Sequence, residues 1–167
     1  MTGFVPPPYP YDRLAPLEAI ASAHPGGLID LSIGTPCDPP PASVMAAMAD
    51  PDATRSYPPS IGTAAYRDSA AGWVARRFGV DLTRDQVAAC VGSKELVAGI
   101  PHWLHLRTPE RDTVLYPEIS YPTYAMGATL AGCRSVPVPV DEHWRLRLDA
   151  IDPADAARAL CLWVNTP

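Results

Sequence analysis

Val87-Ala88-Ala89-Cys90-Val91-Gly92-Ser93-Lys94-Glu95-Leu96-Val97-Ala98 is the stretch that decides the fold. Its apolar run stops at Gly92, and apolar residues at helical spacing follow. A strand that turns directly into a helix points free backbone N–H groups and the positive end of the helix dipole at one spot, which favours an anion such as phosphate. We therefore expect the backbone N–H groups of Ser93 and Lys94, with the Ser93 hydroxyl, to bind phosphate. The alternative is a helix that starts in the core and binds nothing.

Short apolar runs alternate with helical patterns through the rest of the chain. This alternation predicts an α/β fold, with a mostly parallel sheet flanked by helices and ligands at the carboxyl ends of the strands. The expected strands are 86–91, 113–116, 135–140 and 159–164, and the expected helices between them are 93–106, 122–131 and 148–157.

The residues before this region are different in character. Residues 1–27 are rich in proline and contain one expected helix, Asp12–Ala23, so they read as an extended arm. Such an arm is either a disordered tail or a segment that lies across a partner subunit. Two more helices are expected at 43–49 and 63–78, the second ending at Gly79.

Composition excludes several classes of protein. The 167 residues are 47% hydrophobic and 19% charged, with a formal net charge of −5, which is typical of a globular protein and not of a nucleic-acid-binding one. No apolar run reaches the length of a membrane span, and no signal peptide is recognisable. The four cysteines are too widely spaced for a zinc site and read as reduced, mostly buried thiols, so we expect a cytoplasmic protein without a metal site.

Several motifs occur in a characteristic order along the whole chain. They are Asp12-Arg13-Leu14-Ala15-Pro16, Ser32-Ile33-Gly34-Thr35-Pro36, Ser56-Tyr57-Pro58-Pro59, Ser60-Ile61-Gly62-Thr63, Gly92-Ser93-Lys94-Glu95, Tyr121-Pro122-Thr123-Tyr124 and Val164-Asn165-Thr166-Pro167. The chain thereby resembles the N-terminal part of the class I/II aminotransferases, which have fold type I and use pyridoxal 5'-phosphate (PLP). The first two motifs are most similar to those of actinobacterial N-succinyldiaminopimelate aminotransferases.

The resemblance implies a division of the chain and a set of site residues. Residues 1–27 would form the arm, 28–80 the first segment of the small domain with its link, and 81–167 the first part of the PLP-binding domain. The implied contacts of the site are the cofactor phosphate on Ser93 and Lys94, the cofactor ring on Tyr121, the phosphate of the partner subunit on Tyr57, and the substrate carboxylate beside Gly34.

Alternatives exist for each of these residues. Tyr124 could replace Tyr121 in stacking, and either tyrosine could simply pack in the core. Tyr57 could be an ordinary loop residue and Gly34 a turn glycine before Pro36. Lys94 is the only lysine in the chain, but a side chain on the phosphate turn lies at the wrong end of PLP to hold its aldehyde. The family's Schiff-base lysine lies further along, so we expect no catalytic residue here and an inactive N-terminal fragment.

The function implied by the resemblance is amino transfer in lysine biosynthesis. The donor and acceptor would be N-succinyl-L,L-diaminopimelate and 2-oxoglutarate, and the full-length enzyme would be a homodimer. The alternatives are an aminotransferase for another amino acid, such as aspartate or an aromatic one, and a non-catalytic α/β domain that binds a phosphorylated ligand.

Overall fold

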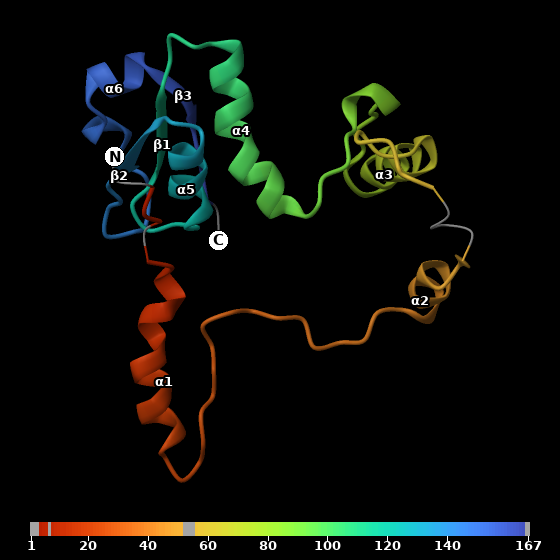
Figure 1. Ribbon diagram of the computed structural model, residues 1–167, viewed down its shortest axis with the longest axis horizontal. Helices are drawn as coiled ribbons and strands as arrows, with labels where there is room; N and C mark the ends of the chain where they lie inside the picture. Colours follow the sequence, from red (N-terminus) through yellow and green to blue (C-terminus); the bar gives the residue numbers. More distant parts are fainter. Residues whose placement is uncertain (1–3, 7, 52–55, 166–167) are drawn as a thin grey trace. The chain divides into compact units, whose positions relative to one another are not determined.

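The computed structural model describes residues 4–6, 8–51 and 56–165 (Figure 1). The chain divides into two compact units, Met1–Pro58 and Pro59–Pro167. Within the described residues, no helix is both long enough and apolar enough to cross a membrane.

A three-stranded parallel sheet forms the centre of the second unit. Strand β1 (Thr113–Pro117) lies between β2 (Arg134–Val138) and β3 (Ala159–Leu162). The central strand is the most buried part of the unit, with Thr113 and Val114 fully buried. All three strands point the same way, which confirms the expected α/β fold with a parallel sheet.

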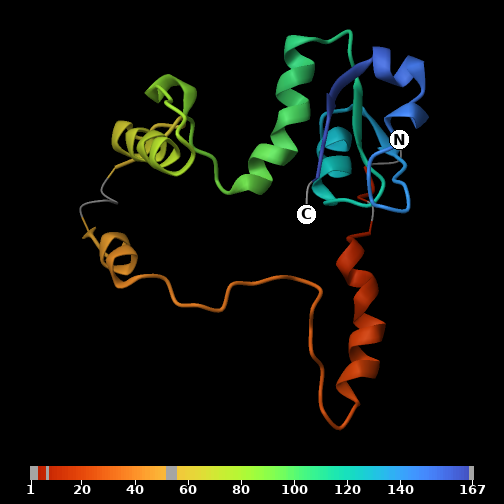
Figure 2. The same cartoon turned by 180° about the vertical axis from the view of Figure 1, so that it is seen from behind.

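Two helices pack beside this sheet. Helix α4 (Ser93–Arg107) and helix α5 (Thr123–Leu130) lie side by side in both views (Figures 1 and 2). The helices approach closely at Gly127, where an added Cβ would lie 3.1 Å from the Ala98 carbonyl oxygen. This close packing fixes the first turn of α4 relative to the loop that follows β1.

Two of the expected elements differ from the prediction, and strand β3, expected to reach residue 164, ends at Leu162. The helix expected at 148–157 is broken into a 3-10 turn (Leu148–Ala150) and α6 (Pro153–Ala157), because Asp152 caps a new helix by accepting a bond from the Ala154 N–H (2.7 Å). Strand β2 stops at Val138, and Val140 instead forms an antiparallel bridge with Leu146.

The strand expected at 86–91 is wrong. A 3-10 turn occupies Arg84–Gln86, and the residues after it are extended but join no sheet among the described residues. A strand needs a neighbouring ladder, and here the Ala89 N–H donates to the Ile61 carbonyl (2.9 Å) instead. The expectation of mostly buried cysteines fails for the same reason at Cys90, which is exposed, and Cys37 is exposed too.

The remaining two cysteines lie in the sheet region and are half-buried free thiols. Burial raises the pKa of Cys161 to about 11, so this thiol stays protonated near neutral pH.

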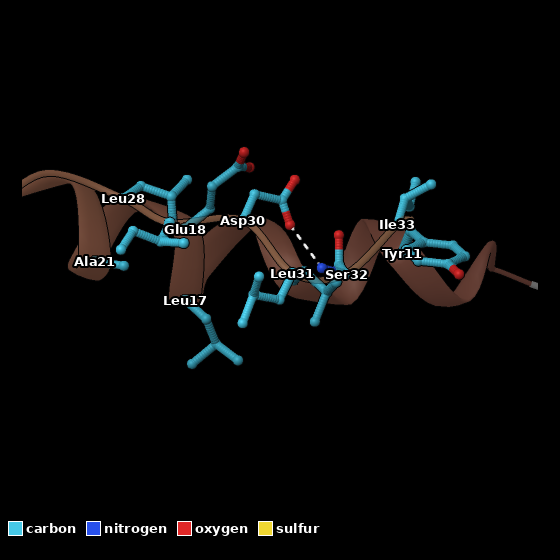
Figure 3. A pocket seen from close by; sticks show the side chains of 11 residues that line it. Tyr11, Leu17, Glu18, Ala21, Leu28, Asp30, Leu31, Ser32 and Ile33 are labelled. Atoms are coloured by element: carbon cyan, nitrogen blue, oxygen red, sulfur yellow. Dashed lines mark hydrogen bonds between the residues drawn. The ribbon is translucent and has the colours of Figure 1, made fainter. Parts of the chain in front are cut away.

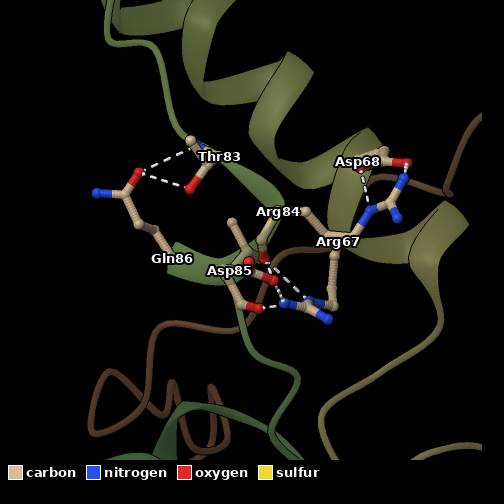
Figure 4. Close-up of polar contacts among 7 residues, drawn as sticks. Arg67, Asp68, Thr83, Arg84, Asp85 and Gln86 are labelled. Atoms are coloured by element: carbon tan, nitrogen blue, oxygen red, sulfur yellow. Dashed lines mark hydrogen bonds and ion pairs between the residues drawn. The ribbon is translucent and has the colours of Figure 1, made fainter.

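Helix α3 (Ala64–Phe78) holds the segment that leads to α4. Its Arg67 is buried, and Nε donates to the carbonyl oxygens of Arg84 (3.0 Å) and Val87 (2.7 Å) (Figure 4). A second guanidinium nitrogen, Nη2, reaches the Asp85 carboxylate at 3.1 Å. The helix ends at Gly79 in the left-handed conformation (φ 66°), as expected.

The regular elements described in the first unit are helices, separated by a long irregular segment at 23–41. It contains a 3-10 turn (Pro10–Leu14), α1 (Ala15–Ser22) and α2 (Ala42–Met48). The helix expected at 12–23 and the one expected at 43–49 are therefore present with small shifts at their ends. Many apolar side chains of this unit are exposed, among them Ile29 (81%) and Leu31 (89%).

Candidate cofactor site

The first turn of α4 has the features of an anion site. Gly92 precedes it with φ 77° and ψ 155°, a conformation open to glycine but strained for other residues. The N–H groups of Ser93 and Lys94 have no partner among the described residues. The carboxylate of Glu95, in the same turn, accepts a bond from the Val91 N–H, which lies before the helix.

Tyr121 lies in the loop that leaves the carboxyl end of β1. The Ser120 hydroxyl donates to the Pro117 carbonyl (2.6 Å) and holds this loop close to the strand end. The Lys94 Nζ lies over the Tyr121 ring, 6.0 Å from its centroid, a cation–π contact. The structure therefore brings Ser93, Lys94 and Tyr121 together, although the expected strand before Gly92 is missing.

Two aromatic residues complete this region, and sequence reasoning did not find the second of them. Tyr124 is 9% exposed, and its ring forms a T-shaped pair with that of Tyr121, with centroids 5.8 Å apart. Its face stacks on Trp163, with centroids 4.8 Å apart and an interplanar angle of 11°. The Tyr-x-x-Tyr spacing hinted at Tyr124, but Trp163 is close only because β3 lies next to β1.

Tyr57 and Gly34 belong to the first unit. The Tyr57 side chain is fully exposed (101%). A Cβ added at Gly34 would meet no described atom within 4 Å. The roles expected for these two residues, at the partner's phosphate and at the substrate carboxylate, stay predictions.

A pocket of about 390 Å³ opens in the first unit, between α1 and residues 28–33 (Figure 3). Leu17, Leu28 and Ile33 contribute to an apolar lining, and the carboxylates of Glu18 and Asp30 lie in the same wall. Hydrogen bonding to the Ser32 side chain, and then to the Ser32 backbone N–H (2.9 Å from the carboxylate Oδ1), lowers the pKa of Asp30. Two carboxylates make this pocket unsuitable for a phosphate.

The start of α4 fits the phosphate of PLP, and Tyr121 fits its ring. Two amides without partners among the described residues and one hydroxyl can donate hydrogen bonds to a phosphate, and the positive end of the helix dipole favours its charge. Tyr121 is 37% exposed, so part of its ring is open to a flat ligand. Among the described residues, no group of three or more His, Cys, Asp or Glu side chains could hold a metal ion.

Comparisons with known proteins match this chain to one family. The model of the family "Aminotransferase class I and II" matches residues 27–167. A 4-dedimethylamino-4-oxo-anhydrotetracycline transaminase of Streptomyces rimosus is 42% identical over 161 residues. The alignment covers 96% of this chain and 42% of the length of the transaminase. An LL-diaminopimelate aminotransferase of Desulforudis audaxviator is 38% identical over 167 residues, and the alignment covers 96% of this chain and 42% of the relative's length.

A solved structure shows the same likeness. The probable N-succinyldiaminopimelate aminotransferase of Thermus thermophilus superposes with a TM-score of 0.69 at 32% identity. The superposed region covers 89% of this chain and 41% of the length of the Thermus protein. The chain thus spans about two fifths of the length of these relatives. With its parallel sheet and a family match over residues 27–167, this chain belongs to the class I and II aminotransferases, a family of PLP-dependent enzymes.

Proposed function

We propose that this chain is the N-terminal portion of a PLP-dependent aminotransferase and binds the phosphate and one ring face of the cofactor. The observation that carries the proposal is the contact between the start of α4 and Tyr121, with Lys94 Nζ 6.0 Å from the ring centroid. Phosphate donors and an aromatic surface are then adjacent, as a phosphorylated aromatic ligand requires. The arm, small-domain and PLP-domain segments at 1–27, 28–80 and 81–167 belong to this proposal.

Each residue has a separate task. The amides of Ser93 and Lys94 and the Ser93 hydroxyl bind phosphate oxygens, each bond contributing about 1.5–3 kcal/mol because the acceptor is charged. Tyr121 covers one face of the ring and keeps water from it. PLP, when bound, supplies the electron-accepting ring that amino transfer needs. Gly34 leaves room for a substrate carboxylate.

For the substrates, we propose N-succinyl-L,L-diaminopimelate as amino donor and 2-oxoglutarate as acceptor, in lysine biosynthesis. The names of the Desulforudis and Thermus relatives support a diaminopimelate-type donor. A second candidate is an aminotransferase for another substrate, which the Streptomyces relative favours, since its name describes a transaminase acting on a tetracycline precursor.

We also propose a cytoplasmic homodimer in which Tyr57 reaches the phosphate of the partner's site. The exposed apolar side chains of the first unit support an interface, because surfaces of this kind are usually covered in an assembly. The four free thiols fit a reducing compartment.

Two assays test the proposed activity. The protein expressed from its native gene should transfer the amino group of N-succinyl-L,L-diaminopimelate to 2-oxoglutarate faster than that of aspartate, phenylalanine or unmodified diaminopimelate. If aspartate or phenylalanine is the better donor, our substrate assignment is wrong, whereas a protein that binds PLP without any turnover would support a non-catalytic binding domain.

The 167-residue chain by itself should show no turnover. Its only lysine, Lys94, lies on the phosphate turn and cannot also hold the aldehyde end of PLP. The measurement is glutamate formation from 2-oxoglutarate and the donor, with chain purified from a host strain lacking its own aminotransferases. Turnover that disappears in Lys94→Ala would show that Lys94 is catalytic.

A further inference from the structure

We propose that Tyr124 and Trp163 are positioning residues that fix the ring plane of Tyr121 for the cofactor. This inference rests on the proposed function. Neither residue needs to touch PLP, because both act through Tyr121.

The three rings are arranged as two preferred aromatic pairs. Tyr121 meets Tyr124 at an interplanar angle of 90°, and Tyr124 lies nearly parallel to Trp163, at 11°. Edge-to-face and offset-stacked pairs are the two arrangements that aromatic rings prefer. The rotation of the exposed Tyr121 ring is therefore restricted by a buried ring that is itself fixed on its other side.

The three rings come from different parts of the second unit. Tyr121 precedes α5, Tyr124 lies in its first turn, and Trp163 follows β3 directly. The backbone N–H of Trp163 donates to the Leu115 carbonyl oxygen (2.9 Å), and this bond holds the residue beside the central strand. The stack thus connects the loop after β1 to the end of β3, and the sheet register sets the position of Tyr121.

Hydrogen bonds of the side chains contribute little to the Tyr124–Trp163 pair. The Trp163 Nε1 is buried and finds no acceptor among the described residues. The Tyr124 hydroxyl reaches the Asn165 Oδ1 at 3.4 Å, a long distance for an O–H···O bond. Ring packing, rather than polar bonding, therefore holds the pair, and phenylalanine should be able to replace either residue.

The test compares two probes with different needs. Inorganic phosphate uses only the Ser93 and Lys94 donors, whereas PLP also uses the Tyr121 face. We expect Tyr124→Leu to weaken PLP binding about tenfold, leave phosphate binding within twofold and change the induced circular dichroism of bound PLP. Tyr124→Phe should restore all three properties. The protein is the one expressed from its native gene, and titration calorimetry measures both affinities.

Tyr116→Leu is the matched control. Tyr116 is a half-buried tyrosine of β1 whose hydroxyl contacts the Ser135 hydroxyl (2.9 Å), outside the three-ring cluster. The Tyr116→Leu variant should have the same ratio of PLP affinity to phosphate affinity as the wild type. If Tyr124→Leu does not fold, Trp163→Leu against Trp163→Phe makes the same comparison with the other half of the stack.

The outcomes separate the two proposals. Normal PLP binding by the leucine variants, or an equal loss of PLP and phosphate binding, would overturn the positioning role while the proposed function stands. A wild-type protein that binds neither PLP nor phosphate would overturn the proposed function, and the positioning role with it.

Discussion

At the scale of single residues, Gly92 is the position on which the candidate site depends most. Its backbone, at φ 77° and ψ 155°, directs the following amides to one spot, and a Cβ added at Gly92 would meet no described atom within 4 Å. The penalty for a side chain is thus conformational rather than steric.

We expect Gly92→Ala to weaken PLP binding about tenfold or more, because the turn must change its shape. Gly79→Ala is the control, since Gly79 also has a positive φ (66°) and open space around it but ends α3. Calorimetric titration with PLP checks both variants. Equal PLP affinity in the two variants would show that the Gly92 turn does not bind the cofactor.

At the scale of elements, α3 and the segment after it are joined by one buried guanidinium. Arg67 bonds two carbonyl oxygens and one carboxylate at once, which the single ammonium of a lysine cannot reproduce in that geometry. Arg67→Lys should lower the free energy of unfolding of the second unit by about 1–3 kcal/mol. Urea denaturation followed by tryptophan fluorescence measures it. Arg76→Lys, on an exposed turn of the same helix, is the control and should change little.

A second element-scale contact lies at the amino ends of the strands. Arg158, just before β3, pairs with Asp112, just before β1, and its Nε–Oδ1 distance is 2.8 Å. The hydrogen bond from Arg158 lowers the pKa of Asp112 below its ordinary value of 3.8. A carboxyl group whose pKa is lower in the folded state stabilises the fold above its unfolded pKa, and this stabilisation is lost as the pH falls through the folded value.

The melting temperature should therefore fall as the pH is lowered from about 5 through the Asp112 pKa. Asp112→Asn should flatten this dependence of the melting temperature on pH. The control Asp81→Asn, at an exposed position, should leave the dependence as in the wild type. Melting curves from pH 7 down to about pH 2.5 make the comparison. An unchanged pH slope in Asp112→Asn would mean that this ion pair does not contribute to acid stability.

At the scale of the whole molecule, assembly is the feature to test. If the arm crosses to a partner and Tyr57 binds the partner's phosphate, deleting residues 1–10 should weaken the dimer. Tyr57→Phe should weaken PLP binding by about 1.5–3 kcal/mol, the value of a charge-assisted bond. Sedimentation over a dilution series and PLP titration are the measurements. Tyr9→Phe, another exposed tyrosine of the first unit, serves as control for the titration. A monomer that retains PLP normally would rule out a shared site.

Local signals explain how much of this molecule could be predicted from its sequence. Helix α4 and strands β1, β2 and β3 follow from apolar spacing and glycine stops. The segment 86–91 has the composition of a strand, but strand formation depends on a neighbouring ladder that a local pattern cannot reveal. Ser93 and Tyr121 were found as separate motifs, whereas the Tyr124–Trp163 stack depends on β3 lying beside β1, which is a property of the sheet order.

The central claim is that the start of α4 and the Tyr121 ring bind one PLP molecule. A crystal structure of the protein expressed from its native gene, grown with PLP, tests it most directly. We expect phosphate oxygens within about 3.2 Å of the Ser93 and Lys94 backbone nitrogens, and the pyridine ring lying against Tyr121. PLP bound elsewhere, with the amides of Ser93 and Lys94 facing only water, would contradict the claim.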